Sequence, residues 1–458
     1  MKYDIPVEKN KTYEMDITDL GKGGEGIGRI KEFAIFVEDA VPGDHIEVLI
    51  IKVKNRYAYG KLMKVLNPSV YRTQPLCPVA NKCGGCQLQH VTYEGQLCFK
   101  TKMVKDDLER IGGLEDVTVL STIGMSEPFH YRNKAQFPVG EKDGVLQTGF
   151  YAKRTHRIVD TKKCWIQNKV NERILEIVRT FMEEEHISPY AEKSHKGLVR
   201  HILTRVGYTT GEIMFCLVLN GKKLPYAEKL VEKLLQVEGM TSIVLNENRS
   251  QTNVILGEKT QVLWGKGFIT DYIGEIKFEI SLLSFYQVNP VQTRVLYEKA
   301  LELADLQGHE TVLDIYCGIG TISLFFAQKA KKVFGVEIVP DAIEDARRNA
   351  EINGIQNAEF FVGAAEDVIP KLYDEKGITP DVVVVDPPRK GCDEGVLRTI
   401  IEMKPQKVVY VSCDPATLAR DLGILCENGF EVQIVQPVDQ FPMTTHVESV
   451  VLMTKIEK

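Results

Sequence analysis

The chain has 458 residues, of which 44% are hydrophobic and 26% are charged, and its formal net charge is −6 at pH 7. A chain of this length and composition can bury a core in each of two or three domains, which excludes a disordered protein. The negative net charge excludes a global basic field, so any nucleic-acid surface must be local. Its longest apolar runs have strand length, far below the roughly 20 residues that span a bilayer. The amino-terminal Met-Lys-Tyr-Asp lacks the apolar region of a signal peptide. We therefore expect a cytoplasmic protein without membrane segments.

The first 65 residues alternate short apolar runs with glycine and proline turns. Phe33 to Val37 and Ile46 to Val53 are two such runs. The pattern predicts a small β-barrel. A basic and aromatic strand face of this barrel would suit single-stranded nucleic acid, and its residues are Lys52, Lys54, Arg56, Tyr57 and Tyr59. The alternative is a solvated edge strand whose lysines prevent pairing with another sheet.

Three of the ten cysteines, Cys77, Cys83 and Cys86, lie within ten residues of one another. The two glycines between Cys83 and Cys86 let both thiolates turn toward one metal centre. Cys164, in a polar stretch, is favoured as a fourth ligand over Cys98, which lies in a helical pattern. Four thiolates can hold zinc or an iron–sulfur cluster, and the spacing leaves both open. Free thiols in a loop are the alternative.

Residues 66–284 mix strand and helix patterns and contain three basic islands. One island alone is typical of an exposed face, but three of them beside a thiolate cluster and a basic barrel favour RNA as the partner. The islands are His130 to Lys134, with Arg132; Lys153 to Arg157, with Arg154; and Leu198 to Arg205.

Strand and helix patterns alternate from residue 311 onward. This order predicts an α/β fold with a doubly wound parallel sheet, in which ligands bind at the carboxyl ends of the strands. The predicted strands are 311–316, 332–337, 381–385 and 408–411, and the predicted helices are 322–330 and 342–353.

A glycine turn, Gly318-Ile-Gly320, follows the first of these strands. Glu337, at the end of the second strand, is placed to accept hydrogen bonds from a ribose diol. A dinucleotide dehydrogenase uses the same arrangement, but the third glycine of that pattern is absent. Together with Asp386-Pro-Pro at a later strand end and a strand-end cysteine, Cys413, the turn favours an S-adenosylmethionine pocket.

Cys413 stands where an apolar strand gives way to a helix, in Ser412-Cys413-Asp414-Pro415. This position makes it the candidate nucleophile, and a buried structural thiol is the alternative. Because a thiolate is the reactive form, we expect the site to depress the pKa of Cys413.

These motifs resemble those of a known family. The chain resembles, over nearly its whole length, the RNA uracil-5-methyltransferases, specifically the 23S ribosomal RNA (uracil-5-)-methyltransferases with a TRAM barrel and a cysteine-ligated cluster. The match rests on Ser284 to Asn289, Asp386 to Gly391, Ser412 to Leu422 and His446 to Glu448. The resemblance implies a TRAM barrel at residues 1–65, a central cluster-bearing domain at 66–284 and a methyltransferase domain at 285–458. It also implies that residues 97–127 pack with the catalytic domain.

The resemblance also implies roles for individual residues. Cys413 falls at the position of the nucleophile and Glu448 at that of the base. One departure is Thr321, where some relatives have a cofactor-contacting Asn. The cofactor positions are Gln287, Tyr316, Gly318, Gly320, Glu337 and Asp386; the implied ligands of a 4Fe-4S cluster are Cys77, Cys83, Cys86 and Cys164; and RNA contacts are expected at Lys52, Lys54, Arg56, Arg132, Lys134 and Arg154.

The expected function is therefore methylation of C5 of a uridine in 23S ribosomal RNA by a monomeric enzyme. Cys413 would add to C6 of the base, and Glu448 would later remove the C5 proton. The barrel and the cluster favour ribosomal RNA. Methylation of a transfer-RNA uridine by the same mechanism and a non-catalytic RNA-binding protein are the alternatives.

Overall fold

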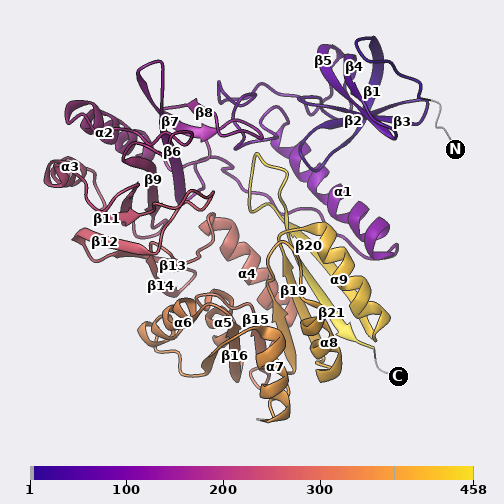
Figure 1. Cartoon of the computed structure of the whole chain (residues 1–458). Coiled ribbons are helices and arrows are strands. Elements are labelled where there is room, and N and C mark those ends of the chain that lie inside the picture. Colours follow the sequence, from indigo (N-terminus) through magenta and orange to yellow (C-terminus); the bar gives the residue numbers. More distant parts are fainter. Residues whose placement is uncertain (1–4, 376, 457–458) are drawn as a thin grey trace. The chain divides into compact units, whose positions relative to one another are not determined.

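The computed structural model describes residues 5–375 and 377–456, and the chain forms two compact units (Figure 1). Of the described residues, the smaller unit contains 5–100, 150–159 and 441–445. The larger unit contains 101–149, 160–375, 377–440 and 446–456, so the central and carboxy-terminal segments form one body. Among residues 5–375 and 377–456, no helix combines the length and hydrophobicity needed to cross a bilayer.

The smaller unit begins with a closed five-stranded barrel of order β1-β2-β3-β5-β4. Alternate residues point inward, and Ile35, Val48 and Ala58 are completely buried in its core. The predicted barrel is thus confirmed, and its strands are β1 (Thr12–Leu20), β2 (Gly26–Ile30), β3 (Phe33–Val37), β4 (His45–Val53) and β5 (Tyr57–Asn67).

The larger unit contains a seven-stranded sheet of order β12-β11-β10-β9-β6-β7-β8, whose β7–β8 hairpin crosses the boundary between the units. Its strands are β6 (Lys134–Lys142), β7 (Val145–Tyr151), β8 (Ile158–Asp160), β9 (Val199–Val206), β10 (Ile213–Leu219), β11 (Met240–Glu247) and β12 (Lys259–Gly265). Helices α2 (Val170–Glu184) and α3 (Ala227–Leu234) accompany it, and β13 (Phe268–Ile273) pairs with β14 (Ile276–Ser281).

The second seven-stranded sheet has the order β17-β16-β15-β18-β19-β21-β20. The predicted doubly wound parallel sheet is confirmed for β15, β16, β18 and β19. The sheet also contains β21, which runs antiparallel to both of its neighbours. The strands are β15 (Thr311–Ile315), β16 (Lys332–Glu337), β17 (Ala358–Val362), β18 (Val382–Val385), β19 (Lys407–Ser412), β20 (Phe430–Val438) and β21 (Glu448–Lys455). The helices are α1 (Tyr93–Gly112), α4 (Pro290–Ala304), α5 (Thr321–Ala327), α6 (Pro340–Ile352), α7 (Ala365–Asp374), α8 (Glu394–Met403) and α9 (Pro415–Glu427).

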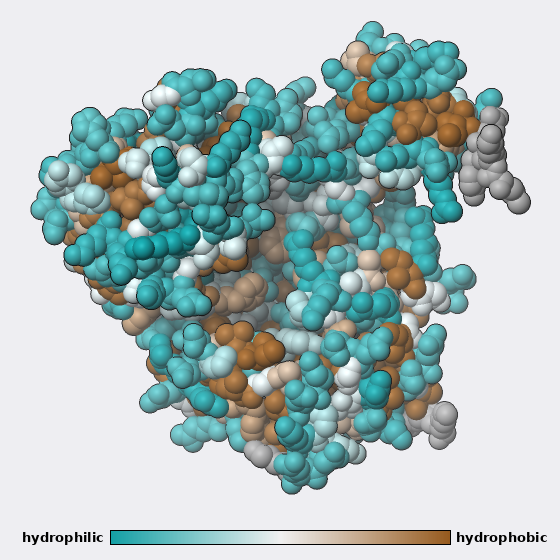
Figure 2. Space-filling model, viewed as in Figure 1, coloured by the Kyte–Doolittle hydropathy of each residue, from teal (hydrophilic) through white to brown (hydrophobic). Residues whose placement is uncertain are grey.

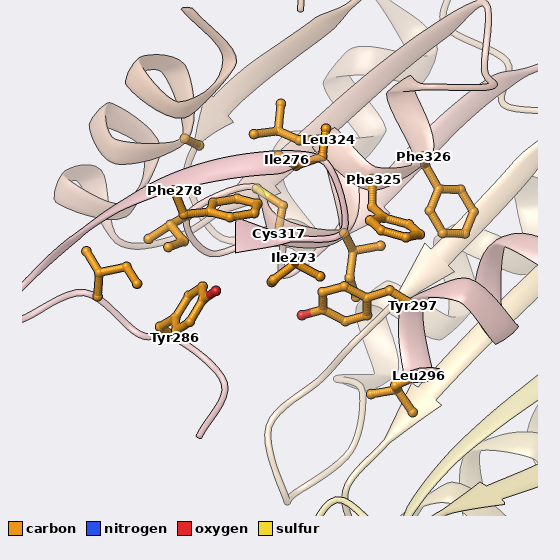
Figure 3. Packing of buried hydrophobic residues seen from close by; sticks show 14 of the residues in the cluster. Ile273, Ile276, Phe278, Tyr286, Leu296, Tyr297, Cys317, Leu324, Phe325 and Phe326 are labelled. Atoms are coloured by element: carbon orange, nitrogen blue, oxygen red, sulfur yellow. The ribbon is translucent and has the colours of Figure 1, made fainter. Parts of the chain in front are cut away.

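Both faces of this second sheet are covered. Val382 and Val384 of β18 belong to one hydrophobic core with residues of α4, α5 and α6, whereas Val383 and Val385 belong to another with residues of α7, α8 and α9. Val104 of α1 joins the second core. Successive side chains of a strand point to opposite faces of the sheet, and both faces are buried here. Every position of β18 is therefore apolar, which explains the continuous run of valines. Figure 3 shows the first core, with Cys317 among aromatic and aliphatic side chains.

Residues 101–123, which include the second half of α1 and the segment after it, belong to the larger unit. Leu120 N–H donates to the carbonyl of Val435 at 2.9 Å, and Ile123 N–H donates to that of Pro437 at 2.9 Å. This segment is therefore fixed along β20. The molecular face in Figure 2 is mostly hydrophilic, with separate hydrophobic patches, as expected where the apolar cores are internal.

Candidate active site

The carboxyl ends of the parallel strands bring the predicted cofactor residues to one edge of the second sheet. Ile315 lies opposite Val385, and Val385 lies opposite Tyr410 of β19. The residues that follow, Tyr316 and Asp386, therefore lie at this edge, where α/β proteins bind their ligands.

The glycine turn between β15 and α5 requires its two glycines for different reasons. Gly318 has φ 55°, and no heavy atom lies within 4 Å of where a Cβ would stand, so the space before it is open. Gly320 has φ 80°, and a Cβ there would lie 3.1 Å from the ring of Phe360. The turn leaves room for a ligand and packs closely on its other side.

Glu337 connects the glycine turn to the start of α6. Its Oε2 accepts a hydrogen bond from Gly318 N–H at 3.2 Å, and its Oε1 accepts one from Val339 N–H at 2.9 Å. The side chain is half-buried, and a carboxylate has further lone pairs. Glu337 can therefore accept ribose hydroxyls while it orders the turn.

Two carboxyl groups, Asp314 and Asp386, lie close to each other below this edge. Burial, and then the charge of the neighbouring Asp314, raise the pKa of Asp386 to about 7. Burial also raises the pKa of Asp314 to about 7, although Ser323 Oγ donates to its Oδ2 at 2.5 Å. Its Oδ1 is buried without a hydrogen-bond partner. The pair supplies buried oxygen acceptors at this edge.

The backbone conformation at Tyr316 and a backbone hydrogen bond at Gln287 determine where these two residues lie. Tyr316 has φ 71°, a left-handed conformation that costs a non-glycine residue roughly 1–3 kcal/mol and that clusters at functional sites. Gln287 is 9% exposed, and its carbonyl accepts from Asn133 Nδ2 at 2.9 Å. Two residues later Asn289 caps α4, with its side chain accepting from Gln292 N–H.

These residues fit S-adenosylmethionine. The open glycine turn, the half-buried carboxylate of Glu337 and the acids Asp314 and Asp386 match a nucleoside that carries a positive charge.

Cys413 and Glu448 come together through the strand that the sequence did not predict as antiparallel. Ser412, the last residue of β19, pairs with Ser449 of β21, so the adjacent residues Cys413 and Glu448 lie opposite each other. Cys413 is half-buried, and Glu448 is 3% exposed. Glu448 is therefore a buried acid and not a surface one.

The expectation of a depressed pKa at Cys413 is also wrong for this ligand-free arrangement. Burial, and then the charges of Glu448 and Asp386, raise the pKa of the thiol to about 12. Arg389 opposes this rise, and the amino terminus of α9 also favours an anion. Burial and the Asp386 charge likewise raise the pKa of Glu448 to about 8. Two acids beside a thiol destabilise its thiolate.

The motif after Cys413 orders the loop that carries Arg389. Asp414 Oδ1 accepts from Ala416 N–H at 3.0 Å and so caps α9. The buried carboxylate of Asp421 accepts from Cys392 N–H at 2.8 Å, and Arg420 Nη2 donates to the Lys390 carbonyl at 3.0 Å. These bonds hold the segment after Asp386 against α9.

The predicted cluster ligands are not arranged as a metal site. Among residues 5–375 and 377–456, no group of three or more His, Cys, Asp or Glu side chains is placed to bind a metal ion. Cys83 Sγ instead accepts from Gly85 N–H at 3.4 Å, and burial raises the pKa of its thiol. Cys164 lies in the other compact unit.

The barrel presents the expected basic and aromatic surface. The rings of Phe36, Tyr57 and Tyr59 contact one another, with centroids 5.5–6.0 Å apart. Arg154 Nη2 donates to Glu25 at 3.2 Å, and its charge acts on Tyr59. Lys52 is exposed in β4 opposite Tyr59, and Lys54 and Arg56 are exposed in the connection between β4 and β5.

The other two basic islands are not exposed surfaces. All of β9, including Arg200 and Arg205, is buried, because this strand lies between β10 and β6 inside the sheet. Arg132 and Lys134 are half-buried. The interpretation of residues 198–205 as an exposed basic island is therefore wrong.

The sequence analysis placed none of three further residues in the site. Asn133 holds the Gln287 carbonyl, Arg389 acts on Cys413 and Glu448, and Arg205 binds the 282–284 loop. Asn133 and Arg205 lie in basic islands, but the sequence does not reveal their long-range partners.

Comparisons with known proteins agree with this geometry. Residues 92–456 match the family model described as tRNA (Uracil-5-)-methyltransferase, and residues 6–63 match that of the TRAM domain. An uncharacterized RNA methyltransferase of Clostridium tetani is 55% identical over 455 residues, which cover 99% of this chain and 98% of that protein. One of Halalkalibacterium halodurans is 52% identical over 453 residues, 99% of each chain.

A solved structure is similar over nearly the whole fold. The crystal structure of Pyrococcus abyssi tRNA (uracil-54, C5)-methyltransferase in complex with S-adenosyl-L-homocysteine has a TM-score of 0.77 and 31% sequence identity. The similarity covers 96% of this chain and 100% of that one.

Proposed function

Because the chain belongs to the tRNA (uracil-5-)-methyltransferase family and carries a TRAM domain, we propose that this methyltransferase transfers a methyl group to C5 of a uridine in 23S ribosomal RNA. The observation that carries the proposal is the juxtaposition of Cys413 and Glu448 beside Asp386. Bound S-adenosylmethionine would supply an electrophilic methyl group on a positively charged sulfur.

The residues account for the chemistry that uracil requires. C5 of uracil is a weak nucleophile, so the Cys413 thiolate first adds to C6 and shifts electron density to C5. C5 then bonds to the methyl group, and the donor sulfur leaves with its electron pair. Glu448 takes the C5 proton, the C6–S bond breaks, and the thiolate of Cys413 returns.

The raised pKa values suit this sequence of steps. A positively charged cofactor beside Asp386 and Glu448 offsets the charges that oppose the thiolate of Cys413. A base with a pKa near 8 accepts a proton effectively near neutral pH. We therefore infer that Cys413 ionises after the cofactor binds.

The site residues Gln287, Tyr316, Gly318, Gly320 and Glu337 would hold the cofactor. The half-buried carboxylate of Glu337 would accept from the ribose, and Asp386 would face the charged part of the molecule. Gln287 is held by Asn133 and would supply an amide to the same pocket.

Ribosomal RNA is the proposed substrate, and transfer RNA is the second candidate. The barrel surface of Phe36, Tyr57 and Tyr59 with its neighbouring cations supports binding of unpaired RNA. The similar Pyrococcus abyssi protein is named as a transfer-RNA enzyme, which favours the second candidate. A non-catalytic RNA-binding protein would not need Cys413 and Glu448 together.

We also propose that Cys77, Cys83, Cys86 and Cys164 bind a 4Fe-4S cluster, with zinc as the alternative. The support is the close sequence spacing of the first three thiols. We assign the cluster a structural role, because Cys413 supplies the nucleophile. The three-domain division, a monomeric state and a cytoplasmic location stay predictions.

The central test is incubation with radiolabelled S-adenosylmethionine and, separately, unmodified 23S ribosomal RNA and transfer RNA. We expect label in C5-methyluridine of ribosomal RNA. Cys413→Ala should abolish it, Glu448→Gln should accumulate a covalent protein–RNA adduct, and Cys426→Ala, a change of another half-buried thiol, should retain activity.

Each other outcome contradicts part of the proposal. Label in transfer RNA alone would mean that transfer RNA is the substrate. No label in either RNA would favour the alternative of a non-catalytic RNA-binding protein. For the cluster, iron and zinc content and visible absorbance of anaerobically purified protein are the readouts. Loss of iron in Cys83→Ser but not in Cys98→Ser supports the assignment, whereas iron-free wild-type protein contradicts it.

A further inference from the structure

Two basic side chains project from one face of the β6–β9 pair. Lys134 of β6 lies directly opposite Arg205 of β9. Side chains of a directly opposed pair project from the same face of a sheet. Burial, and then the charges of Arg205 and Arg132, lower the pKa of Lys134 to about 8. Both arginines are thus close enough to Lys134 for their charges to act on it.

The structure leaves hydrogen-bond capacity in this cationic group unused. Arg205 is 3% exposed, and its Nη2 donates to the carbonyls of Leu282 and Ser284 at 3.1 and 2.5 Å. Its Nε is buried without a partner, as is the Nε of Arg132. No carboxylate contributes to the shift at Lys134. Buried cations without an anion are costly, so the group is suited to a negatively charged ligand.

Asn133 and Arg205 both hold the loop that carries Gln287. Between Arg132 and Lys134, Asn133 donates from its N–H to the Val288 carbonyl and from its Nδ2 to the Gln287 carbonyl, each at 2.9 Å. Arg205 binds the beginning of this loop through Leu282 and Ser284. An anion held here would therefore lie next to a segment of the candidate active site.

We propose that Arg132, Lys134 and Arg205 bind one backbone phosphate of the RNA at or beside the uridine that enters the active site. The inference rests on the proposed function. A phosphodiester carries one negative charge and two free oxygens that accept from guanidinium and ammonium donors. Holding that phosphate would position a flipped nucleotide without reading its sequence.

Different partners distinguish this group from Arg200. Arg200 also lies in β9, but its Nη1 donates to the carbonyls of Asn248 and Ser250, and its guanidinium lies over the ring of Tyr190. Arg200 is thus a buried arginine of the same strand, and the partners described for it include no lysine or second arginine. Arg200→Gln therefore serves as a control for general damage to the sheet.

The test measures RNA affinity at several salt concentrations, without turnover. For Lys134→Gln and Arg132→Gln we expect weaker binding and a salt dependence, d log K/d log[salt], that is shallower by about 0.7, the value for one phosphate of single-stranded RNA. Lys162→Gln, a change of an exposed lysine, should keep the wild-type slope. Lys134→Arg should restore the slope if charge is what matters.

A second measurement locates the phosphate. Single methylphosphonate linkages, which are uncharged, are placed in turn around the modified uridine. We expect one position to weaken binding of the wild-type protein and of Arg200→Gln but to have no further effect on Lys134→Gln. Equal losses at every position in all proteins would overturn the proposal.

The remaining outcomes separate this inference from the proposed function. The variants of these cations could leave RNA affinity and its salt dependence unchanged but impair binding of S-adenosylmethionine. That result would mean that the cations bind the carboxylate of the cofactor, and the phosphate proposal would fail. If no RNA is methylated by the wild-type protein, the proposed function fails, yet the salt and methylphosphonate results still report on the phosphate.

Discussion

Cys413 lies opposite Glu448 because Ser412 pairs with Ser449 in the antiparallel β19–β21 ladder. In a parallel sheet, only carboxyl ends of strands reach the ligand-binding edge. The reversal of β21 brings its first residue, Glu448, to that edge instead. One reversed strand thus places a candidate base beside a candidate nucleophile that is 35 positions earlier in the chain, as their residue numbers give.

Glu448→Gln should stabilise the fold, most strongly at alkaline pH. The fold raises the pKa of Glu448 from 4.5 to about 8, so the folded protein favours the protonated acid. That contribution to stability is fully present below pH 4.5 and is lost as the pH rises through about 8. Glutamine resembles the neutral acid at every pH. We expect a gain of roughly 1–3 kcal/mol in the free energy of unfolding at pH 8 and less at pH 5.

Denaturant unfolding at the two pH values measures this effect. Glu431→Gln, in the neighbouring strand β20 but exposed, should leave stability nearly unchanged at both. Equal effects of the two substitutions would contradict the argument from burial.

The thiol of Cys413 should be unreactive in the ligand-free protein. Burial and two acids raise its pKa to about 12, so the thiolate fraction near neutral pH is small. We expect alkylation by iodoacetamide at pH 7.5 to be at least about 100-fold slower at Cys413 than at the exposed Cys98, measured peptide by peptide with mass spectrometry.

The same experiment at pH 9 tests the contribution of Glu448. Because Glu448 is ionised above pH 8, Glu448→Gln removes a charge and should speed alkylation of Cys413 about 3- to 10-fold. The rate at Cys98 is the internal reference. A Cys413 that reacts as fast as Cys98 in wild-type protein would restore the original expectation of a depressed pKa.

Gly391→Ala should destabilise the loop that carries Arg389. Gly391 has φ 80°, and a Cβ there would lie 2.4 Å from Arg420 Nη2 and 2.6 Å from Asp421 Oδ2. We expect a loss of about 2–4 kcal/mol, part from the left-handed backbone and part from the displaced ion pair.

Gly429→Ala separates the two parts. Gly429 has φ 94°, but nothing lies within 4 Å of its added Cβ, so its cost is that of the backbone alone, about 1 kcal/mol. Thermal melts of both variants, with methylation rates alongside, measure the difference. A Gly391→Ala variant no worse than Gly429→Ala would show that the loop adjusts freely.

Tyr59→Leu should weaken RNA binding without a comparable loss of stability. Tyr59 forms a cluster with Phe36 and Tyr57 on the barrel, and stacking of a base on an aromatic ring contributes about 1–3 kcal/mol. We expect an affinity for 23S ribosomal RNA that is about 5- to 30-fold lower, measured by filter binding at one fixed salt concentration. Tyr208→Leu, a change of a tyrosine with 61% exposure, is the matched control. Similar losses in both variants would point away from the barrel cluster.

The sequence alone determined the elements and most of the local chemistry. Period-two patterns gave the barrel strands, and the alternation of valine-rich runs with helical segments gave the α/β sheet, because both signals lie within a few residues. The glycine turn, Glu337 and the Asp414 cap of α9 are local features of the same kind. Family resemblance supplied Glu448, which no local pattern distinguishes from a surface acid.

Only the tertiary structure decided which side chains meet and which charges are buried. The direction of β21 depends on pairing between distant strands, and it sets Glu448 against Cys413. The raised pKa of Cys413 depends on burial and on two acids, Glu448 and Asp386, from different strand ends. Arg205 looked like part of a basic surface, but its place in a central strand makes it a buried cation opposite Lys134. Burial and long-range electrostatics depend on distances in space, which spacing along the chain does not give.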